Sequence, residues 1–223
     1  MSQTDDPTTF SSSVEDYVKA IYSLTRHDAT ASTSDVAERL GISAGSVSTM
    51  VKRMDAAGLV EHVAYRGVKL TDEGERLALR VLRRHRLLEL FLAKSLDIPW
   101  EDVHRYADAL EHAATDELIE VIAAKLGDPA ADPHGDPIPS REGVIDDRAT
   151  TSLADLSPGA QATIVRVSDS DPEMLRYLAD AEISIGDELE MIGRAPFDGP
   201  VEVRIGDRTH ALGVGLARAI HVR

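Results

Sequence analysis

The stretch DVAERLGISAGSVSTMVKRMDAAGLV, residues 35–60, decides the fold. It predicts a short helix over residues 33–40, which ends at Gly41. Ser43 is a typical cap for a second helix over residues 44–57, which a further glycine ends. Two helices joined by such a tight turn are typical of a helix-turn-helix.

The flanking sequence completes a winged domain. Apolar residues spaced three and four apart between Val14 and Leu24 predict a helix before the motif. After the motif, residues 59–64 and 68–71 are strand-like and flank the tripeptide 65–67, which predicts a short hairpin. This order is that of a winged helix-turn-helix, whose second motif helix enters the major groove of DNA.

The second motif helix and the hairpin carry the candidate DNA contacts. Small side chains at the helix start allow close approach to bases, and the basic residues beyond them suit phosphates. Between Leu40 and Leu70 four basic residues accompany two acidic ones, so this segment is locally positive. Spacing alone leaves open a three-helix domain whose surface charges have no function. The candidate contacts are Ser43, Ala44, Ser46, Ser48, Thr49, Lys52, Arg53, Arg66 and Lys69.

The net charge of −15 is distributed unevenly over the 223 residues. Residues 1–95 hold 13 basic and 13 acidic residues, whereas residues 96–223 hold 11 and 26. The acidity therefore does not exclude nucleic acid, because the half with the helix-turn-helix is neutral. Only five lysines, and 23 aspartates against 16 glutamates, indicate a surface adapted to high salt, as in a halophile.

Composition excludes several other classes of protein. Cysteine is absent, which rules out disulfides, thiolate zinc sites and cysteine nucleophiles. No apolar run approaches the length of about eighteen residues that spans a membrane. The first 13 residues lack an apolar signal core. We therefore expect a cytoplasmic protein that does not contact membranes.

Helices and a linker are expected after the hairpin. An apolar stripe predicts a helix that begins at Asp72, and the pattern predicts a second helix from about Glu101 to Leu126. Residues 128–150 contain four prolines and several aspartates, a composition typical of a linker.

The last part of the chain is expected to form a small β-barrel. Short apolar or alternating segments between glycine and proline signals predict strands at residues 160–167, 188–192, 201–205 and 217–222. A short helix is expected at residues 174–180. The predicted fold class is α+β: a winged helix-turn-helix at 1–72, an all-α region at 73–127, a linker at 128–150 and a small barrel at 151–223.

Ligand-type side chains recur on one face of each predicted helix beyond the hairpin. His85 and Glu89 are four residues apart and share a face. Four others fall within an arc of roughly 100° on the next helix: His104, Asp108, Glu111 and His112. Imidazoles with carboxylates and no sulfur suit Mn(II), Fe(II), Co(II) or Zn(II). In an Asp-rich protein such a face is often merely solvated, so spacing alone leaves metal binding open. The other histidines considered lack such neighbours and are interpreted as surface or structural: His27, His62, His134 and His210.

These motifs resemble the diphtheria toxin repressor family of metal-dependent repressors, which includes DtxR, IdeR and MntR. The resemblance runs in family order over nearly all of the chain. It is carried by SVEDYVKAIYSL, the helix-turn-helix, YRGVKLTDEGERLA, RRHRLLELFL, DVHRYADALEHAATDEL and DPHGDPIP. SPGAQATIVRV, LADAEISIGDELEMI and VRIGDRTHALGVGLARAIHV resemble the Src-homology-like (FeoA-like) barrel of longer members.

The resemblance implies a repressor rather than an enzyme. It implies a homodimer that binds double-stranded operator DNA, with two dimers on one operator as an option. A divalent metal then acts as corepressor, orders the N-terminal helix and sets the spacing of the two DNA-reading heads. The helical region supplies both the dimer interface and the metal sites.

The resemblance also implies which residues bind metal. The primary site comprises Asp16, Asp108, Glu111 and His112, and the ancillary site comprises His85, Glu89 and His104. In longer members the barrel adds polar ligands. By position these are Asp171 and, because Met174 replaces the expected amide ligand, Glu173 as an alternative.

Departures from the family pattern bear on the identity of the metal. Iron-type members carry Met and Cys at the positions of Asp16 and Asp108, whereas manganese-type members carry carboxylates there. These harder ligands favour Mn(II) over Fe(II). Lys19 replaces a further Glu ligand of manganese-type members without the barrel, so their two-metal cluster cannot be transferred to this chain.

Two other functions compete with this interpretation. A metal-independent winged-helix regulator would sense an organic ligand in an apolar, aromatic pocket, and an aromatic content of 4% disfavours it. A metallohydrolase would use the same side chains to activate water. No nucleophile motif, Gly-rich phosphate loop or HExxH motif supports that second function.

Overall fold

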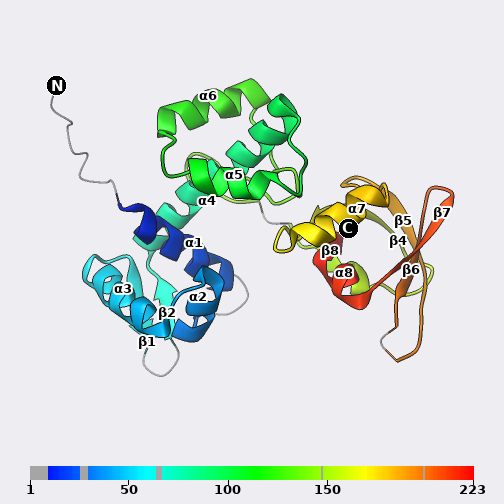
Figure 1. Cartoon of the computed structure of the whole chain (residues 1–223), viewed down its shortest axis with the longest axis horizontal. Helices are drawn as coiled ribbons and strands as arrows, with labels where there is room; N and C mark the ends of the chain where they lie inside the picture. Colours follow the sequence, from blue (N-terminus) through cyan, green and yellow to red (C-terminus); the bar gives the residue numbers. More distant parts are fainter. Residues whose placement is uncertain (1–9, 26–29, 64–66, 147, 198) are drawn as a thin grey trace. The chain divides into compact units, whose positions relative to one another are not determined.

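The computed structural model describes residues 10–25, 30–63, 67–146, 148–197 and 199–223 (Figure 1). Over these residues the chain divides into two compact units. The first comprises the described part of Met1–Arg84 together with Pro139–Val144. The second comprises the described part of His85–Ile138 and Ile145–Arg223. Among the described helices, none combines the length and the hydropathy needed to span a bilayer.

The first unit is a winged helix-turn-helix, as the sequence predicts. Its elements are α1 (Ser12–Thr25), α2 (Thr33–Leu40), α3 (Ala44–Ala56), β1 (Val60–Val63) and β2 (Gly67–Leu70). Gly41 ends α2 with a φ of 65°, and the Ser43 side chain accepts the backbone N–H of Ser46 at the start of α3. Strands β1 and β2 pair antiparallel as the wing. Apolar side chains from these elements form one core, in which Val18, Ile21, Val36, Val47 and Val68 are completely buried.

Helix α4 (Asp72–Leu96) contributes to both units, because the division falls after Arg84. The helix expected over residues 101–126 is in fact two helices, α5 (Val103–Leu110) and α6 (Asp116–Leu126). The helical pattern breaks because Thr115 caps a new helix: its side chain accepts the backbone N–H of Leu118.

The expected linker is a packed segment over much of its length. Within it, His134 is completely buried and Asp132 and Ile138 are each 8% exposed. Gly135 has a φ of +84°, and a Cβ there would lie 2.0 Å from the carbonyl oxygen of Val165. This segment therefore packs tightly against the following domain, although its composition is typical of a linker. His134 is a buried residue and not a surface residue.

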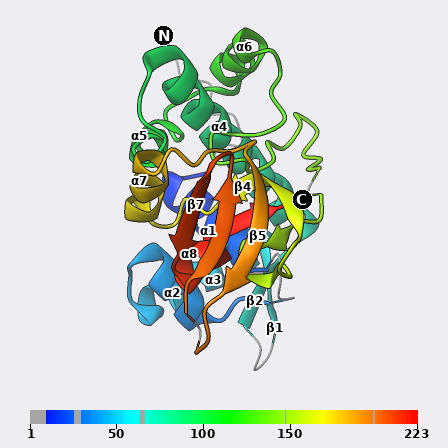
Figure 2. The ribbon, with the colours of Figure 1, turned by 90° about the vertical axis from the view of Figure 1, so that its right-hand side faces the viewer.

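The β domain of the second unit is an antiparallel sheet, onto which Figure 2 looks. Its described strands follow the order β3-β8-β4-β5-β6-β7. They are β3 (Thr151–Ser152), β4 (Gln161–Val167), β5 (Glu188–Arg194), β6 (Val201–Ile205), β7 (Arg208–Leu212) and β8 (Ile220–Val222). A single turn η1 (Leu153–Asp155) and helices α7 (Pro172–Asp180) and α8 (Val214–Ala219) complete the domain.

Two expectations for the β domain need correction. The strand expected over residues 217–222 begins only at Ile220, because Gly213 starts α8 and its buried Ala217 packs into the core. Strand β7, which the sequence analysis did not identify, pairs with β6 along its whole length. Its residues are mostly polar, so the apolar pattern that reveals the other strands is missing.

Candidate metal centre and DNA-reading surface

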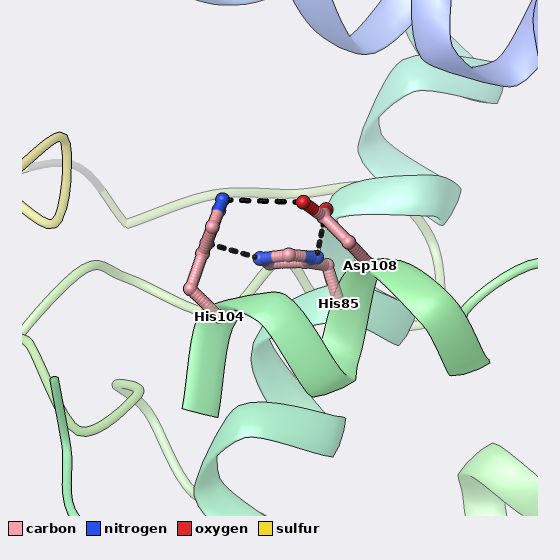
Figure 3. A group of neighbouring side chains, drawn as sticks. All are labelled: His85, His104 and Asp108. Atoms are coloured by element: carbon pink, nitrogen blue, oxygen red, sulfur yellow. Dashed lines mark hydrogen bonds and ion pairs between the residues drawn. The ribbon is translucent and has the colours of Figure 1, made fainter. Parts of the chain in front are cut away.

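Helices α4 and α5 bring four candidate ligands together in the second unit, and Figure 3 shows three of them, His85, His104 and Asp108. His85 Nε2 and His104 Nδ1 lie 3.0 and 3.1 Å from the same Glu89 oxygen. Asp108 closes the group, with oxygens 3.5 Å from His85 Nδ1 and 3.4 Å from His104 Nε2. We call these four residues the His–carboxylate cluster.

Glu111 and His112 extend this cluster at the end of α5. The Glu111 side chain is 1% exposed, and one of its oxygens lies 2.6 Å from His85 Nδ1. The other oxygen lies 3.5 Å from His112 Nε2. His85 therefore contacts ligands assigned to both predicted metal sites. Asp16, the remaining primary-site candidate, lies on α1 in the first unit and is half-buried.

Two further residues join the cluster that the sequence analysis did not assign to it. Asp169, just before α7, has an oxygen 3.3 Å from His104 Nδ1. His134, in the packed segment, has Nδ1 3.9 Å from a Glu89 oxygen. One ligand atom each from Glu89, His134 and Asp169 lie within 4.8 Å of one another. For His134 the sequence signal was the DPHG motif, but its proline-rich surroundings led to its interpretation as part of a linker.

The orientation of His134 suits a metal ligand. Its Nε2 lies 2.8 Å from the backbone carbonyl oxygen of Trp100, to which it can only donate, and the indole stacks on its ring. This bond leaves the Nδ1 lone pair facing Glu89. Within the described residues, His134 Nδ1 and the facing Glu89 Oε2 have no hydrogen-bond partner. Buried polar atoms without partners are costly, and a divalent cation would satisfy both. The residues present thus fit a metal with nitrogen and oxygen ligands.

Helix α4 also braces the segment that carries His134. Arg86 donates to the carbonyl oxygen of Pro137 at 2.6 Å and lies 3.3 Å from an Asp136 oxygen. Asp132 accepts the backbone N–H groups of His134 and Asp136 at 2.8 and 2.9 Å. Burial raises the pKa of Asp132 well above its usual value. These contacts hold the His134 ring against the cluster.

Hydrogen bonds within the cluster shift three pKa values. Burial alone would raise the pKa of Glu89, but hydrogen bonds with His104 and His85 outweigh it and hold this pKa below its usual range. The hydrogen bond with Asp169, and then that with Glu89, raises the pKa of His104 to about 10. Burial also opposes ionisation of Asp169, yet its hydrogen bond with His104 lowers its pKa. The carboxylates around His104 therefore favour its charged imidazolium form.

The structure places the two predicted barrel ligands elsewhere. The Asp171 carboxylate accepts the backbone N–H of Glu173 at 2.9 Å and caps α7. Glu173 itself is exposed. Within the described residues, no ion pair or group of candidate ligands joins either carboxylate to the cluster. The barrel carboxylate beside His104 is Asp169, two residues earlier, because Asp171 is occupied with the helix cap.

The candidate DNA contacts form an exposed surface on the first unit. Ser48 and Thr49 donate their hydroxyl groups to backbone carbonyls one turn earlier, at 2.9 and 3.0 Å. Lys69 on the wing pairs with Glu61 at 2.7 Å. Arg66 lies outside the described residues. The exposed candidates are the cap residue Ser43 and, on α3, Ala44, Ser46, Ser48, Thr49, Lys52 and Arg53.

A winged helix-turn-helix followed by a partly buried cluster of histidines and carboxylates defines a class, the metal-responsive DNA-binding regulators. Three family models match the chain in order. They are the N-terminal DNA binding domain of iron dependent repressors at residues 9–68, their metal binding and dimerisation domain at 71–140, and the FeoA domain at 151–223. The chain belongs to the iron-dependent repressor family, whose members are transcriptional repressors rather than enzymes.

Individual relatives agree with this assignment. Iron-dependent repressor IdeR of Mycobacterium tuberculosis is 34% identical over 158 residues, which cover 68% of this chain and 69% of the relative. The diphtheria toxin repressor of Corynebacterium diphtheriae is 32% identical, over 81% of this chain and 84% of its own. A solved manganese-dependent transcriptional repressor in complex with manganese is 41% identical, with a TM-score of 0.89 over 94% of this chain and 99% of its own. The predicted family and fold class are confirmed.

Proposed function

We propose that this chain is a metal-dependent transcriptional repressor that binds operator DNA as a homodimer when loaded with a divalent metal, and so controls metal homeostasis. The observation that carries the proposal is the His–carboxylate cluster, in which His85 and Glu89 are buried, on a chain that also has an exposed DNA-reading helix. Because the operator lies in the cytoplasm, the protein acts there.

The chain offers ligands for two metal sites. The primary site takes Asp108, Glu111 and His112 from the α5 end, with Asp16 from α1 as the family pattern implies. The second takes His85, Glu89 and His104, and we add His134 and Asp169 in place of Asp171 and Glu173, because their ligand atoms lie beside Glu89 and His104. A bound cation would supply positive charge that removes the repulsion among these carboxylates. Asp16 then links the DNA-reading unit to metal occupancy.

Mn(II) is the metal that the ligands favour over Fe(II). The positions of Asp16 and Asp108 carry hard carboxylates, and cysteine is absent from the chain. The similarity to a manganese-dependent repressor, at 41% identity, supports the same choice. Parallel titrations of operator binding with Mn(II) and anaerobic Fe(II) test it. If Fe(II) increases operator affinity more than Mn(II) does, the assignment is reversed.

An apolar surface on α5 and α6 is the proposed dimer interface. Large hydrophobic side chains are exposed there, where a monomer would be expected to bury them. They are Tyr106 at 41%, Leu110 at 45%, Leu118 at 49% and Val121 at 65% exposed. The family model that covers these residues is named for dimerisation. Two such dimers on one operator would place four DNA-reading heads along the duplex, and the stoichiometry of the operator complex tests this.

The acidic second half of the chain is interpreted as an adaptation to high salt. Carboxylates dominate residues 96–223 beyond those assigned to metal. Thermal unfolding measured from low to molar KCl tests this reading, since screening relieves repulsion among like charges. Loss of stability with added KCl would contradict it.

The central test compares operator binding with and without metal in matched variants. Asp16→Ala and Glu111→Ala should fold but lose metal-dependent operator binding, because each removes a proposed primary ligand. Asp146→Ala, which removes an exposed carboxylate paired with Arg148, is the control and should bind as the wild type does. Wild-type operator binding by all three proteins in chelator would refute the proposed function. It would also favour the alternative of a regulator that senses an organic ligand.

A further inference from the structure

Two residues of α3 point away from the protein core. The buried residues of this helix are Val47, Val51 and Met54. At about 100° per residue, Gly45 and Thr49 point roughly 150° and 170° away from the mean direction of those three. In a winged helix-turn-helix this helix enters the major groove, and the family model over residues 9–68 is that of a DNA binding domain. Gly45 and Thr49 therefore lie where α3 comes closest to base pairs.

Among the described residues, packing does not explain why residue 45 is a glycine. Gly45 lies in the first turn of α3 without a positive φ, so its backbone does not require glycine. The nearest atom to an added Cβ would be Ser43 Oγ, at 3.8 Å, which is an ordinary contact. A glycine within a helix costs stability relative to alanine. Close approach of a ligand to the main chain is a further reason for glycine, and DNA supplies it here.

The serines at the start of α3 are less suited than Thr49 to contact a base. Ser43 Oγ accepts the backbone N–H of Ser46 at 3.1 Å, and the two hydroxyl groups lie 2.9 Å apart. This pair caps the helix. Ser48 donates to the Ala44 carbonyl oxygen and points roughly 100° away from Thr49 about the helix axis. Thr49 is thus the hydroxyl side chain at the centre of the exposed face.

Thr49 presents one hydrogen-bond acceptor and one methyl group. Its Oγ1 donates to the carbonyl oxygen of Gly45 at 3.0 Å, which uses the single hydrogen of the hydroxyl group. The oxygen can then only accept a hydrogen bond from a base. The bond also fixes χ1 of this β-branched side chain, so the direction of the methyl group is fixed as well.

An acceptor beside a methyl group matches one kind of base pair. In the major groove adenine presents its N6 donor, and the thymine paired with it presents a C5-methyl group. A G·C pair presents a donor at cytosine N4 but no methyl group, and guanine presents only acceptors. Thr49 therefore gains both contacts only at an A·T pair.

We propose that Thr49 reads one A·T base pair in each operator half-site, and that Gly45 provides the clearance that lets this base pair approach α3. The Thr49 oxygen accepts from adenine N6, and the Thr49 methyl group contacts the thymine methyl group. The inference rests on the proposed function, since it takes operator DNA as the ligand. It adds which base pair the DNA-reading helix selects and by what chemistry.

The test uses the full-length protein with Mn(II) and a duplex that it selects from a random-sequence DNA library. Each thymine of one half-site is replaced in turn by uracil, which removes only the C5-methyl group. The wild type is compared with Thr49→Ser, which loses the protein methyl group, and with Thr49→Val, which loses the acceptor. Thr25→Ser is the matched control, because the Thr25 hydroxyl group donates to the Ile21 carbonyl oxygen at 3.0 Å on α1.

We expect one thymine in the half-site whose methyl group contributes to wild-type binding. Its replacement should weaken binding by the wild type and by Thr25→Ser about fourfold, the effect of one buried methyl group. The same replacement should leave the affinity of Thr49→Ser unchanged, because groups in direct contact are not additive. Thr49→Val should bind the unmodified duplex about two- to tenfold more weakly per half-site, through loss of one hydrogen bond.

Gly45→Ala separates a glycine kept for DNA from one kept for the fold. The variant should unfold at the wild-type temperature or above, because alanine favours the helix and the added Cβ has no close neighbour. Its affinity for the selected duplex should nonetheless fall about fivefold or more, since the added methyl group overlaps the approaching base pair.

Three results would overturn the inference while the proposed function stands. The first is that no uracil replacement distinguishes the wild type from Thr49→Ser, and the second is wild-type affinity of Thr49→Val for the selected duplex. The third is Gly45→Ala that either binds as the wild type does or unfolds at a lower temperature. If the wild type selects no DNA sequence with Mn(II), the proposed function fails and the inference fails with it.

Discussion

Val121 gives the sharpest test of the proposed dimer interface. It lies on α6 and is 65% exposed, more than the other large apolar residues of α5 and α6. We predict that Val121→Asp converts the dimer into monomers at concentrations where the wild type is dimeric. Operator affinity should fall with it, because each monomer would bind with a single DNA-reading head.

The size of the effect follows from the exposed area. Burying a whole valine side chain is worth about 1.5–3 kcal/mol, so burying the exposed 65% is worth about 1–2 kcal/mol. A two-fold interface counts each residue twice, which gives about 2–4 kcal/mol per dimer. At 1.4 kcal/mol per factor of ten, the dimer dissociation constant should rise roughly 30- to 700-fold. Burying the new carboxylate adds to this loss.

Val144 provides a matched control, because it is a valine with 67% exposure outside α5 and α6. Sedimentation equilibrium over a dilution series, at one fixed metal concentration, compares Val121→Asp, Val144→Asp and the wild type. The reasoning is refuted if Val121→Asp dimerises as tightly as the wild type, or if Val144→Asp loses the dimer equally.

Three further outcomes are expected. Gly135→Ala should lower the free energy of unfolding by about 2–4 kcal/mol, from left-handed backbone strain plus overpacking. Gly159 has a similar φ but nothing within 4 Å of an added Cβ, so Gly159→Ala should lose only the part of the stability that backbone strain costs. Urea unfolding of both variants measures the difference. The hydrogen bond with Asp169 raises the pKa of His104 to about 10. The charged His104 should therefore stabilise the fold without metal fully below about pH 6.5, and this stabilisation should be lost as the pH rises through 10. Mn(II) must displace that proton, and calorimetry should show affinity rising from pH 7 towards 10; a flat profile would contradict this. Lys52→Ala should weaken binding to all operator sequences alike and reduce the salt slope by about 1 in filter-binding titrations.

The helix-turn-helix could be predicted from sequence because its signals are local. A glycine in the left-handed region at Gly41 and a capping hydroxyl at Ser43 determine where α2 ends and α3 begins. The face shared by His85 and Glu89 was predictable for the same reason, since it follows from helical spacing. The break between α5 and α6 also has a local signal, the cap at Thr115, but the continuous apolar pattern obscured it.

The rest of the candidate site depends on tertiary packing. His134 reaches Glu89 only because Arg86 binds the backbone of its segment and Gly135 packs against β4. Neither contact has a periodicity or a spacing in the sequence. Asp169 was missed for a related reason, since position along the chain pointed to Asp171, whose carboxylate caps α7.

The packed segment around His134 has an evolutionary consequence. A tether between domains tolerates insertions and deletions, because its length only changes its reach. In this chain a single inserted residue between Asp132 and Ile138 would shift a histidine ring away from Glu89. The segment should therefore keep its length while its exposed residues vary. A descendant that lost the β domain would also lose Asp169, and His104 would need a new carboxylate partner.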